Sequence, residues 1–535
     1  MRPNFIFFIT DQQRADWLGC NGHPVLKTPH IDAIAVQGIS FDRFYVASPV
    51  CMPTRASLMT GRMPSVHGVR ANGTPLSIKS VTFVDLLREA GYQTALIGKS
   101  HLQTFTGLPP LLQPPPIREG FVGPKGESIE AIRHGLQTSI YKQESPAFWA
   151  QPDAKVQTPY YGFSHVELVT GHGDGVDGDY RSWLIEKDPN ALSLIGPDNQ
   201  LPHDYQCPQA IRTRLPAELY QSNYIAERAR AFIESHKASD DERPFFLFVS
   251  FPDPHHPFNP PGKYWDMYSP DEFPVPKAFT QNDWQPPPHV AAVLAERERG
   301  LANLKSQFSF GTNPREAQEA AALTAGMITL IDDAIGSVTK TMEQNGYKDN
   351  TVVIFNSDHG EHLGDHRLLL KGSEQYQQIL RVPFIWSDPS ASSDRQSRAI
   401  HTSALGSAID ISATILERAK IAPYVGMQGK SLLPVITGQS EKVRDYVFIQ
   451  YDHQRTNEAL GGVPRVHTLI NQQWRLSIFD GVEWGELYDL KNDPDEMKNL
   501  WDCPETKEIK NAMIERLARE EINHIDRVPM PVARA

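Results

Sequence analysis

The feature that most constrains the fold is a set of four short apolar runs, each of which leads into ionisable or metal-binding residues. The runs and the residues that follow them are NFIFFIT before Asp11 and Gln12, YQTALIG before Lys99 and His101, PFFLFVSF before His255 and His256, and TVVIFNS before Asp358 and His359. Such runs are typical of strands buried on both faces, as in a parallel sheet covered by helices. One run could end in polar residues merely because loops are polar, but loops more often supply Asn, Ser and Gly. Because ligands bind beyond the carboxyl ends of such strands, the four runs together predict one shared site.

Predicted helices alternate with these runs at 28–38, 81–90, 219–236 and 316–344, which indicates an α/β fold with a mostly parallel central sheet flanked by helices. The length of 535 residues exceeds what one hydrophobic core usually supports. After about residue 440 the pattern changes to short strand-like runs and a helix near 505–523. We therefore predict a catalytic domain at 1–440 and a smaller antiparallel α+β subdomain at 441–535.

Composition excludes several classes of protein. The formal charge is −12 and there is no Lys/Arg block, which argues against a nucleic-acid partner. No apolar run approaches the roughly 18 residues of a membrane span. The four cysteines include no CxxC pair, which argues against a disulfide framework and a structural zinc site and favours reduced thiols. The start MRPNFIFFITDQQ lacks a signal-peptide cleavage pattern, so we expect a cytoplasmic protein.

The residues at the predicted strand ends suit the hydrolysis of a charged ester. Two carboxylates, an amide oxygen and an imidazole form a mostly hard-oxygen set that suits Ca²⁺, Mg²⁺ or Mn²⁺; they belong to Asp11, Gln12, Asp358 and His359. Three nearby cations, Lys99, Lys371 and Arg55, could hold a tetrahedral oxyanion, while His101 and His255 could move protons. Such a set predicts a sulfate- or phosphate-ester hydrolase.

Cys51 stands in SPVCMPTRASLMTG, where a helix is predicted to begin. A helix N-terminus favours a negatively charged nucleophile there. A lone cysteine is more often a buried structural thiol. The surrounding motif decides between the two interpretations.

The segment CMPTR at 51–55, followed by Thr60 and Gly61, resembles the C-x-P-x-R signature of the type I sulfatases, members of the alkaline phosphatase superfamily. Four more segments resemble family motifs in the same order along the chain. They are GYQT through GKSH at 91–101, PHHPF at 254–258, DHGE through GDH and KG at 358–372, and ELYDL through DP at 486–494. The resemblance extends from residue 4 to about residue 500 and implies an alkaline-phosphatase-like fold.

The resemblance implies that a formylglycine-generating maturation enzyme oxidises Cys51 to formylglycine (3-oxoalanine). One hydroxyl of the hydrated aldehyde would attack sulfur, and loss of the proton of the other would release sulfate. The implied roles are as follows: Asp11, Gln12, Asp358, His359 and the modified Cys51 hold the metal; Arg55 orients the diol; Lys99, Lys371 and Asn72 contact the sulfate; His101 serves the second hydroxyl; and His255 contacts the substrate and protonates the leaving oxygen.

Two positions depart from the commonest sulfatase pattern. Gln12 and His359 stand where most members have Asp and Asn, and this pair resembles the phosphonate monoester hydrolase and choline-sulfatase branches. Ca²⁺ is the expected cation, but the imidazole ligand leaves Mn²⁺ open, and Mg²⁺ remains an alternative. Lys99 and His101 are the sulfatase residues. We therefore predict a sulfatase that hydrolyses an aryl or alkyl sulfate monoester. The alternatives are a phosphonate monoester or phosphodiester hydrolase and a non-catalytic anion- or metal-binding relative.

The remaining predictions concern the surroundings of the site. Proline-rich segments at 108–116 and 252–288 are predicted to be pocket walls. The run HGDGVDGDYR at 172–181 lacks EF-hand spacing and is interpreted as a glycine-rich loop. Local hydrogen bonding or a role in shaping the pocket is expected of His362 and His366. Relatives often form dimers or tetramers, so a homo-oligomer is expected, whereas the organic part of the substrate cannot be deduced.

Overall fold

The computed structural model describes residues 2–108, 120, 139–239, 241–281, 283–391, 400–528, 530 and 533, so residues 109–116 of the first proline-rich segment lie outside the described residues. Nine described strands form a central sheet in the order β11-β2-β10-β8-β1-β6-β3-β4-β5. Their bounds are β1 (Asn4–Thr10), β2 (Ile39–Tyr45), β3 (Gln93–Gly98), β4 (His165–Thr170), β5 (Asp177–Gly178), β6 (Phe245–Ser250), β8 (Thr351–Ser357), β10 (Phe384–Ser387) and β11 (Ile400–Ser407). Only β10 and β5 run antiparallel to their neighbours among these strands, which confirms a mostly parallel sheet.

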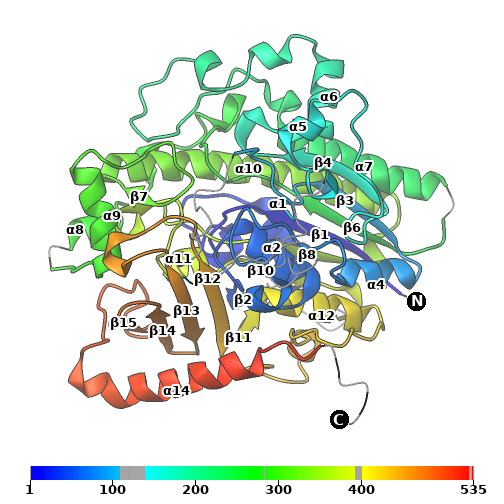
Figure 1. Cartoon of the computed structure of the whole chain (residues 1–535). Helices are drawn as coiled ribbons and strands as arrows, with labels where there is room; N and C mark the ends of the chain where they lie inside the picture. Colours follow the sequence, from blue (N-terminus) through cyan, green and yellow to red (C-terminus); the bar gives the residue numbers. More distant parts are fainter. Residues whose placement is uncertain are drawn as a thin grey trace.

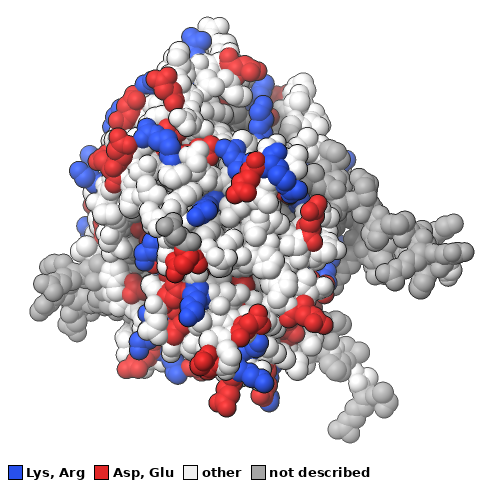
Figure 2. Space-filling model, turned by 90° about the vertical axis from the view of Figure 1, so that its left-hand side faces the viewer, with Lys and Arg blue, Asp and Glu red and all other residues white. Residues whose placement is uncertain are grey.

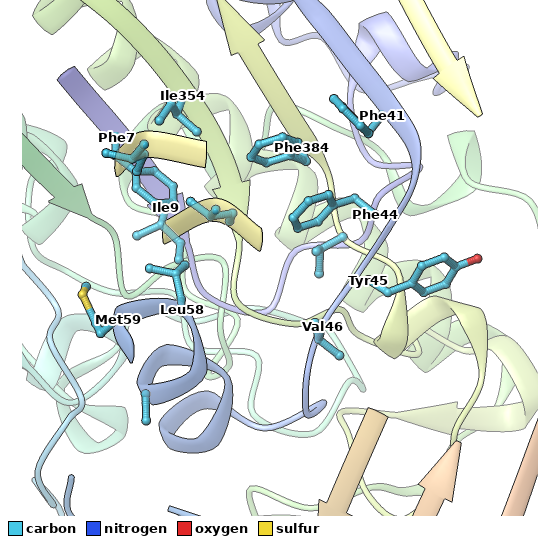
Figure 3. Packing of buried hydrophobic residues seen from close by; sticks show 14 of the residues in the cluster. Phe7, Ile9, Phe41, Phe44, Tyr45, Val46, Leu58, Met59, Ile354 and Phe384 are labelled. Atoms are coloured by element: carbon cyan, nitrogen blue, oxygen red, sulfur yellow. The ribbon is translucent and has the colours of Figure 1, made fainter. Parts of the chain in front are cut away.

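The first strand of the chain lies in the middle of the sheet. β1 pairs in parallel with β6 on one side and β8 on the other, and all seven of its residues are buried. Phe7 lies opposite Phe248 of β6 and Ile354 of β8. Because successive side chains point to opposite faces, Phe7 and Ile9 pack into one core and Phe8 into the other. Figure 3 shows the first core, in which β1 packs over Leu58 and Met59.

Helices cover both faces of this sheet (Figure 1). On one face lie α2 (Cys51–Thr60), α4 (Phe83–Glu89) and α12 (Ala408–Arg418). On the other lie α1 (Pro29–Val36), α7 (Gln221–Ala238) and α10 (Pro314–Gln344). The other described helices before the C-terminal sheet are α3 (Pro64–His67), α5 (Pro146–Trp149), α6 (Asp179–Lys187), α8 (Lys277–Thr280), α9 (Pro288–Glu298), α11 (Gln377–Leu380) and α13 (Leu433–Ile436). The four helices predicted from the sequence are present as α1, α4, α7 and α10.

Helix α10 is long and apolar enough to cross a membrane, and it is the one helix of the described residues that meets this test. Of its most apolar stretch, 83% is buried inside the protein. Its side chains Leu330, Ile331 and Ile335 pack on the sheet in the same core as Ile6 and Phe8. This packing accounts for the apolar character of α10 as that of a core helix.

The C-terminal part forms a separate antiparallel sheet of four strands, as predicted. The strands are β12 (Val447–Asp452), β13 (Arg465–Ile470), β14 (Trp474–Phe479) and β15 (Gly485–Asp489). Helix α14 (Lys507–Asn523) packs on this sheet through Met513 and Leu517. The boundary at 440 and 441 stays a prediction.

A short two-stranded sheet joins β7 (Phe310–Gly311) to β9 (Leu368–Leu369), just before Lys371. The backbone N–H of Ser309 donates to the carbonyl of Lys371 at 2.8 Å. The loop that carries Lys371 is therefore fixed to the segment that precedes β7.

The charged side chains form no large area of one sign on the face that Figure 2 shows, where lysine and arginine lie among aspartate and glutamate. Charged side chains of the chain also form ion pairs, for example Arg228 with Glu167 and Arg212 with Asp266. An extended basic surface, which a nucleic-acid partner would require, is not seen on that face.

Candidate active site

The carboxyl ends of four adjacent strands bring the predicted site residues together. β8, β1, β6 and β3 are neighbours in the sheet and run parallel. Asp358, Asp11, His255 and Lys99 follow these strands, and all are buried. The backbone also crosses between strand ends, since the N–H of Asp358 donates to the carbonyl of Thr10 at 3.1 Å. Parallel pairing, rather than proximity in sequence, thus builds the site.

Cys51 belongs to this site too, but it is the first residue of helix α2 rather than a residue that follows a strand. Val50 before it is extended, and every residue of α2 is buried. Asn72 fixes this turn, because its Oδ1 accepts from the N–H of Met52 at 3.0 Å. The Cys51 Sγ lies 3.1 Å from His359 Nε2 and 3.7 Å from Asp11 Oδ1. Burial and Asp11 raise the pKa of Cys51, but Lys371, His359 and Lys99 outweigh them and hold it below its usual value.

Four side chains form a group that fits a divalent cation. The ligand atoms of Asp11, Cys51, Asp358 and His359 lie within 4.8 Å of one another, and all four residues are buried. His359 Nδ1 donates to the Gly360 carbonyl at 2.9 Å, which leaves Nε2 directed at Cys51. Burial and Lys371 lower the pKa of His359, but Asp358, Cys51 and Asp11 raise it to about 10. The negative charge that raises this pKa, like the ligand types, suits a divalent cation.

Gln12 lies in the site but its amide is bound to other side chains. Its Oε1 accepts from Lys371 Nζ at 2.6 Å, and its Nε2 contacts Glu361 and lies 3.1 Å from His256 Nδ1. Its role as a metal ligand stays a prediction. His256 contacts Gln12 and His255 contacts Lys371, so the two adjacent histidines occupy different places.

Arg55 is held rigidly at the centre of the site. Its Nε donates to Asp358 Oδ2 at 2.7 Å, and its Nη1 donates to Ser250 Oγ at 2.9 Å and to the Lys99 carbonyl at 3.1 Å. Its Nη2 has no partner among the described residues. A buried guanidinium with one free N–H group is suited to bind an oxyanion.

Lys99 lies between a carboxylate and an imidazole. Its Nζ pairs with Asp11 and lies 2.7 Å from His172 Nε2. The Asp11 carboxyl is itself buried, which raises its pKa, but Lys99 and His255 outweigh burial and hold the pKa well below its usual range. The ammonium thus keeps this metal-ligand candidate ionised.

The geometry fixes the tautomer of His255. Its Nδ1 donates to the His256 carbonyl at 2.6 Å, so its Nε2 accepts from Lys371 Nζ at 2.8 Å. Burial and the stacked ring of His172, 3.6 Å away, lower the pKa of His255 well below its usual value. In this arrangement His255 Nε2 carries no proton of its own and accepts a hydrogen bond from Lys371.

His101 is placed by two residues whose roles the sequence analysis did not predict, Glu144 and Phe105. Glu144 accepts from the backbone N–H of His101 at 2.8 Å, and the His101 ring stacks on Phe105 with centroids 3.9 Å apart. Nδ1 of His101 has no partner among the described residues. Burial and Lys99 lower its pKa well below its usual value, so the ring is neutral and can accept a proton. His172, whose role was likewise not predicted, contacts Lys99 and stacks on His255.

One of the missed residues carried a usable signal. The signal is that His172 follows β4, at the same edge of the sheet as the other four strand ends. It was not used because the strand HVELVT is only partly buried and is not a continuous apolar run. Glu144 lies in an irregular segment, and no periodicity marks it.

Apart from His172, the other features singled out in the sequence lie outside the site. In the 172–181 run, Asp174 accepts from Thr213 Oγ1 at 2.6 Å, a structural hydrogen bond. His366 stacks on Tyr376 with centroids 3.5 Å apart and contacts the Glu496 carbonyl. The four cysteines are free, and Cys51 is the one that lies in the metal-ligand group.

The fold and the site together are those of an enzyme with a mixed α/β sheet, in which a candidate cation site lies beside buried basic side chains that suit an oxyanion. The chain belongs to the sulfatase family, because the family model described as Sulfatase matches residues 3–421. A second model, N-sulphoglucosamine sulphohydrolase, C-terminal, matches residues 364–523. The chain is thus a sulfuric ester hydrolase, and the predicted family and activity are confirmed.

The chain is similar to several known proteins over nearly its whole length. It is 26% identical over 534 residues to the arylsulfatase of Clostridium perfringens, covering 98% of this chain and 96% of that protein. It is 26% identical over 549 residues to the multifunctional alkaline phosphatase superfamily protein PehA of Trinickia caryophylli, covering 98% and 96%. Among solved structures, the phosphonate monoester hydrolase of Agrobacterium radiobacter superimposes with a TM-score of 0.75 at 24% identity and covers 99% of this chain and 97% of that one. The predicted alkaline-phosphatase-like fold is confirmed.

Proposed function

We propose that this sulfatase hydrolyses a sulfate monoester at Cys51 after conversion of that residue to formylglycine. The observation that supports the proposal is the position of Cys51: its Sγ lies against His359 and Asp11, inside the cation group, at the buried start of α2. When formed, formylglycine supplies a hydrated aldehyde as the nucleophile. When bound, a divalent cation, with Ca²⁺ first and Mn²⁺ or Mg²⁺ as alternatives, supplies Lewis acidity. Five residues would hold the cation: Asp11, Gln12, Asp358, His359 and residue 51.

Each of the remaining side chains would have a role set by its position in the site. Arg55, fixed on Asp358, offers its free Nη2 to the group at residue 51, and Lys99 and Lys371 bind sulfate oxygens. Lys371 donates a hydrogen bond to His255 across 2.8 Å, and this pair would deliver a proton to the leaving oxygen. The free Nδ1 of neutral His101 would accept the proton that residue 51 loses before sulfate departs.

Peptide mass spectrometry of fully active protein tests this proposal. We expect formylglycine at position 51, and Cys51→Ala should remove nearly all turnover of 4-nitrophenyl sulfate. Arg62→Ala, at a partly buried position where the side chain contacts the Gly426 carbonyl, is a control that should retain turnover. An unmodified Cys51 in protein of full specific activity would refute the mechanism.

A second candidate activity is the hydrolysis of a phosphonate monoester or a phosphodiester. It is favoured by the imidazole of His359 within the cation group, where a neutral ligand leaves more positive charge on the cation. The multifunctional relative PehA is consistent with it. Comparing kcat/KM for 4-nitrophenyl sulfate and a phenyl phosphonate monoester decides between the two, because the main proposal requires sulfate to be faster by orders of magnitude.

We also propose a cytoplasmic location, assembly as a homo-oligomer and maturation by a formylglycine-generating enzyme. Subcellular fractionation tests the first, and light scattering coupled to size-exclusion chromatography tests the second. Expression with and without such a maturation enzyme tests the third, through the mass of the peptide that contains residue 51.

A further inference from the structure

The buried carboxyl group of Glu361 lies next to the candidate cation group but does not belong to it. Its Oε1 accepts from the backbone N–H of Leu363 at 3.2 Å and from the backbone N–H of Leu370. Its Oε2 accepts from Gln12 Nε2. All three partners are N–H donors, so both oxygens act as acceptors, as those of a carboxylate do.

The first oxygen holds the loop that leads to Lys371. Between Glu361 and Lys371, four residues other than glycine have a positive φ: Leu363 (46°), His366 (54°), Arg367 (58°) and Leu370 (67°). This backbone conformation is unfavourable for a residue with a Cβ atom, so hydrogen bonds are needed to hold the loop. Glu361 supplies two of them, and one is at Leu370, the residue directly before Lys371.

The second oxygen sets the orientation of the Gln12 amide. A carboxylate can only accept, so the amide turns its Nε2 toward Glu361 and its Oε1 away from it. Oε1 accepts from Lys371 Nζ at 2.6 Å. The N–H of Gln12 donates to Asp358 Oδ1 at 3.1 Å, which fixes the backbone at the same point. The amide oxygen, the atom that a hard cation prefers, therefore faces the lysine and not the loop.

The remaining contact of this amide adapts to either orientation. His256 Nδ1 lies 3.1 Å from Gln12 Nε2, and a neutral imidazole nitrogen donates or accepts according to its tautomer. Lys371, by contrast, can only donate, and Glu361 only accepts. These two side chains thus fix the two ends of the Gln12 amide.

We propose that Glu361 is a positioning residue of this site, because one carboxylate holds the Lys371 loop and also turns the oxygen of the Gln12 amide toward Lys371. The inference rests on the proposed function, in which Gln12 holds the cation and Lys371 binds sulfate. Side chains that orient a metal ligand in this way affect metal affinity about 10- to 100-fold.

The first variant to measure is Glu361→Gln, which keeps the shape of the side chain but has one oxygen. If that oxygen stays with the two backbone N–H groups, the new NH₂ faces the NH₂ of Gln12; if it turns, the new NH₂ faces the backbone N–H groups. A donor meets a donor in both cases. We expect Ca²⁺ affinity, measured by isothermal titration calorimetry at matched formylglycine content, to fall about 10- to 100-fold.

Exchanging the two groups should restore the site. In Gln12→Glu/Glu361→Gln, the amide oxygen at 361 serves the backbone N–H groups and its NH₂ donates to the carboxylate at 12, whose other oxygen accepts from Lys371. The formal charge is unchanged, and Ca²⁺ affinity should return to within about 3-fold of the wild type. Gln12→Glu alone puts two carboxylates in contact and should lower the Tm. Direct pairing of positions 12 and 361 predicts this rescue, whereas a role of Glu361 in the loop alone does not.

Glu319→Gln is the matched control. Glu319 is also buried; its Oε2 accepts from the backbone N–H groups of Gln206 at 2.6 Å and Cys207 at 2.8 Å, and its Oε1 accepts from Arg315. The contacts are of the same kind but lie outside the site. This variant should lower the Tm and leave Ca²⁺ affinity within about 3-fold of the wild type.

Two outcomes would overturn the inference: unchanged Ca²⁺ affinity in Glu361→Gln, or an exchange variant that binds Ca²⁺ as weakly as Glu361→Gln does. If Glu361→Gln does not fold, a folded exchange variant that binds Ca²⁺ supports the pairing, and an unfolded one rejects it. Mn²⁺ replaces Ca²⁺ as the probe if the wild type binds Mn²⁺ more tightly, and binding of neither would overturn both proposals.

Turnover of sulfate esters separates this inference from the proposed function. Cation binding that depends on Glu361 and is restored by the exchange, without turnover of any sulfate ester, would reject the proposed function and retain the inference. Wild-type turnover together with wild-type cation affinity in Glu361→Gln would reject the inference alone.

Discussion

Replacing Glu144 by glutamine is expected to slow turnover, although this side chain is not placed to contact the substrate. The fully buried carboxylate accepts four hydrogen bonds: from the N–H groups of His101 at 2.8 Å, Leu102 at 3.1 Å and Gln103 at 3.0 Å, and from the Tyr160 hydroxyl at 2.6 Å. His101 has a φ of 55°, in the left-handed region, which costs a non-glycine residue about 1–2 kcal/mol. The carboxylate stabilises this backbone conformation.

The glutamine carboxamide has one oxygen where the carboxylate has two. If that oxygen keeps the three donors now bound to Oε1, the amide NH₂ faces the N–H of His101, and one buried N–H loses its acceptor at a cost of about 1–3 kcal/mol. This cost matches the strain of the His101 backbone, so the loop should relax and displace the imidazole. A displacement of about 1 Å can cost 100-fold in rate. We expect kcat to fall about 10- to 100-fold and KM to change less than about 3-fold.

The assay is steady-state kinetics on protein whose formylglycine content and metal content match those of the wild type. Tyr160→Phe is the matched control, because it removes one donor and leaves every backbone N–H satisfied; it should reduce kcat less than about 3-fold. Wild-type kcat in Glu144→Gln, or an equal loss in Tyr160→Phe, would refute the reasoning.

Three further predictions concern charge. Burial, together with Asp11 and Asp174, raises the pKa of Asp253 to about 8. The folded protein therefore keeps a proton that the unfolded chain releases near pH 4. Between these two pH values the stability of the folded protein falls as the pH rises. Asp253→Asn should therefore show a smaller decrease of Tm than the wild type between pH 5 and pH 8; an equal decrease would contradict the assignment. Arg55→Lys cannot reproduce the hydrogen bonds to Asp358 and Ser250, so kcat/KM should fall at least about 100-fold at unchanged metal content, and a loss below about 3-fold would contradict the role of the guanidinium. Chelation of the cation should abolish turnover and lower the Tm, since Asp11 and Asp358 then lose a shared counter-ion, and added Ca²⁺ should restore both; an unchanged Tm would argue against a bound cation.

The sequence was sufficient to predict a residue's role where that role follows from its neighbours along the chain. β1 and β8 are mostly apolar and buried throughout because both faces are covered, and this property also identifies Asp11 and Asp358 beyond their ends. The sequence was insufficient to predict a residue's role where that role depends on an irregular segment or on an edge of the sheet. Glu144 reaches the His101 backbone across 43 residues of chain, and no local pattern records such a contact.

The central position of the first strand has a consequence for the synthesis of the protein. Thr10, at the end of β1, contacts Ser357, at the end of β8, although they lie 347 residues apart. At 5–20 residues per second, the ribosome takes roughly 20–70 s to make the intervening chain. During this interval the apolar β1 has no native neighbour at β8, and the nascent chain should depend on protection from aggregation. Cys51, which is 1% exposed after folding, should be accessible to a modifying enzyme chiefly in the same interval. The rate of translation would then limit the fraction of protein that acquires a nucleophile.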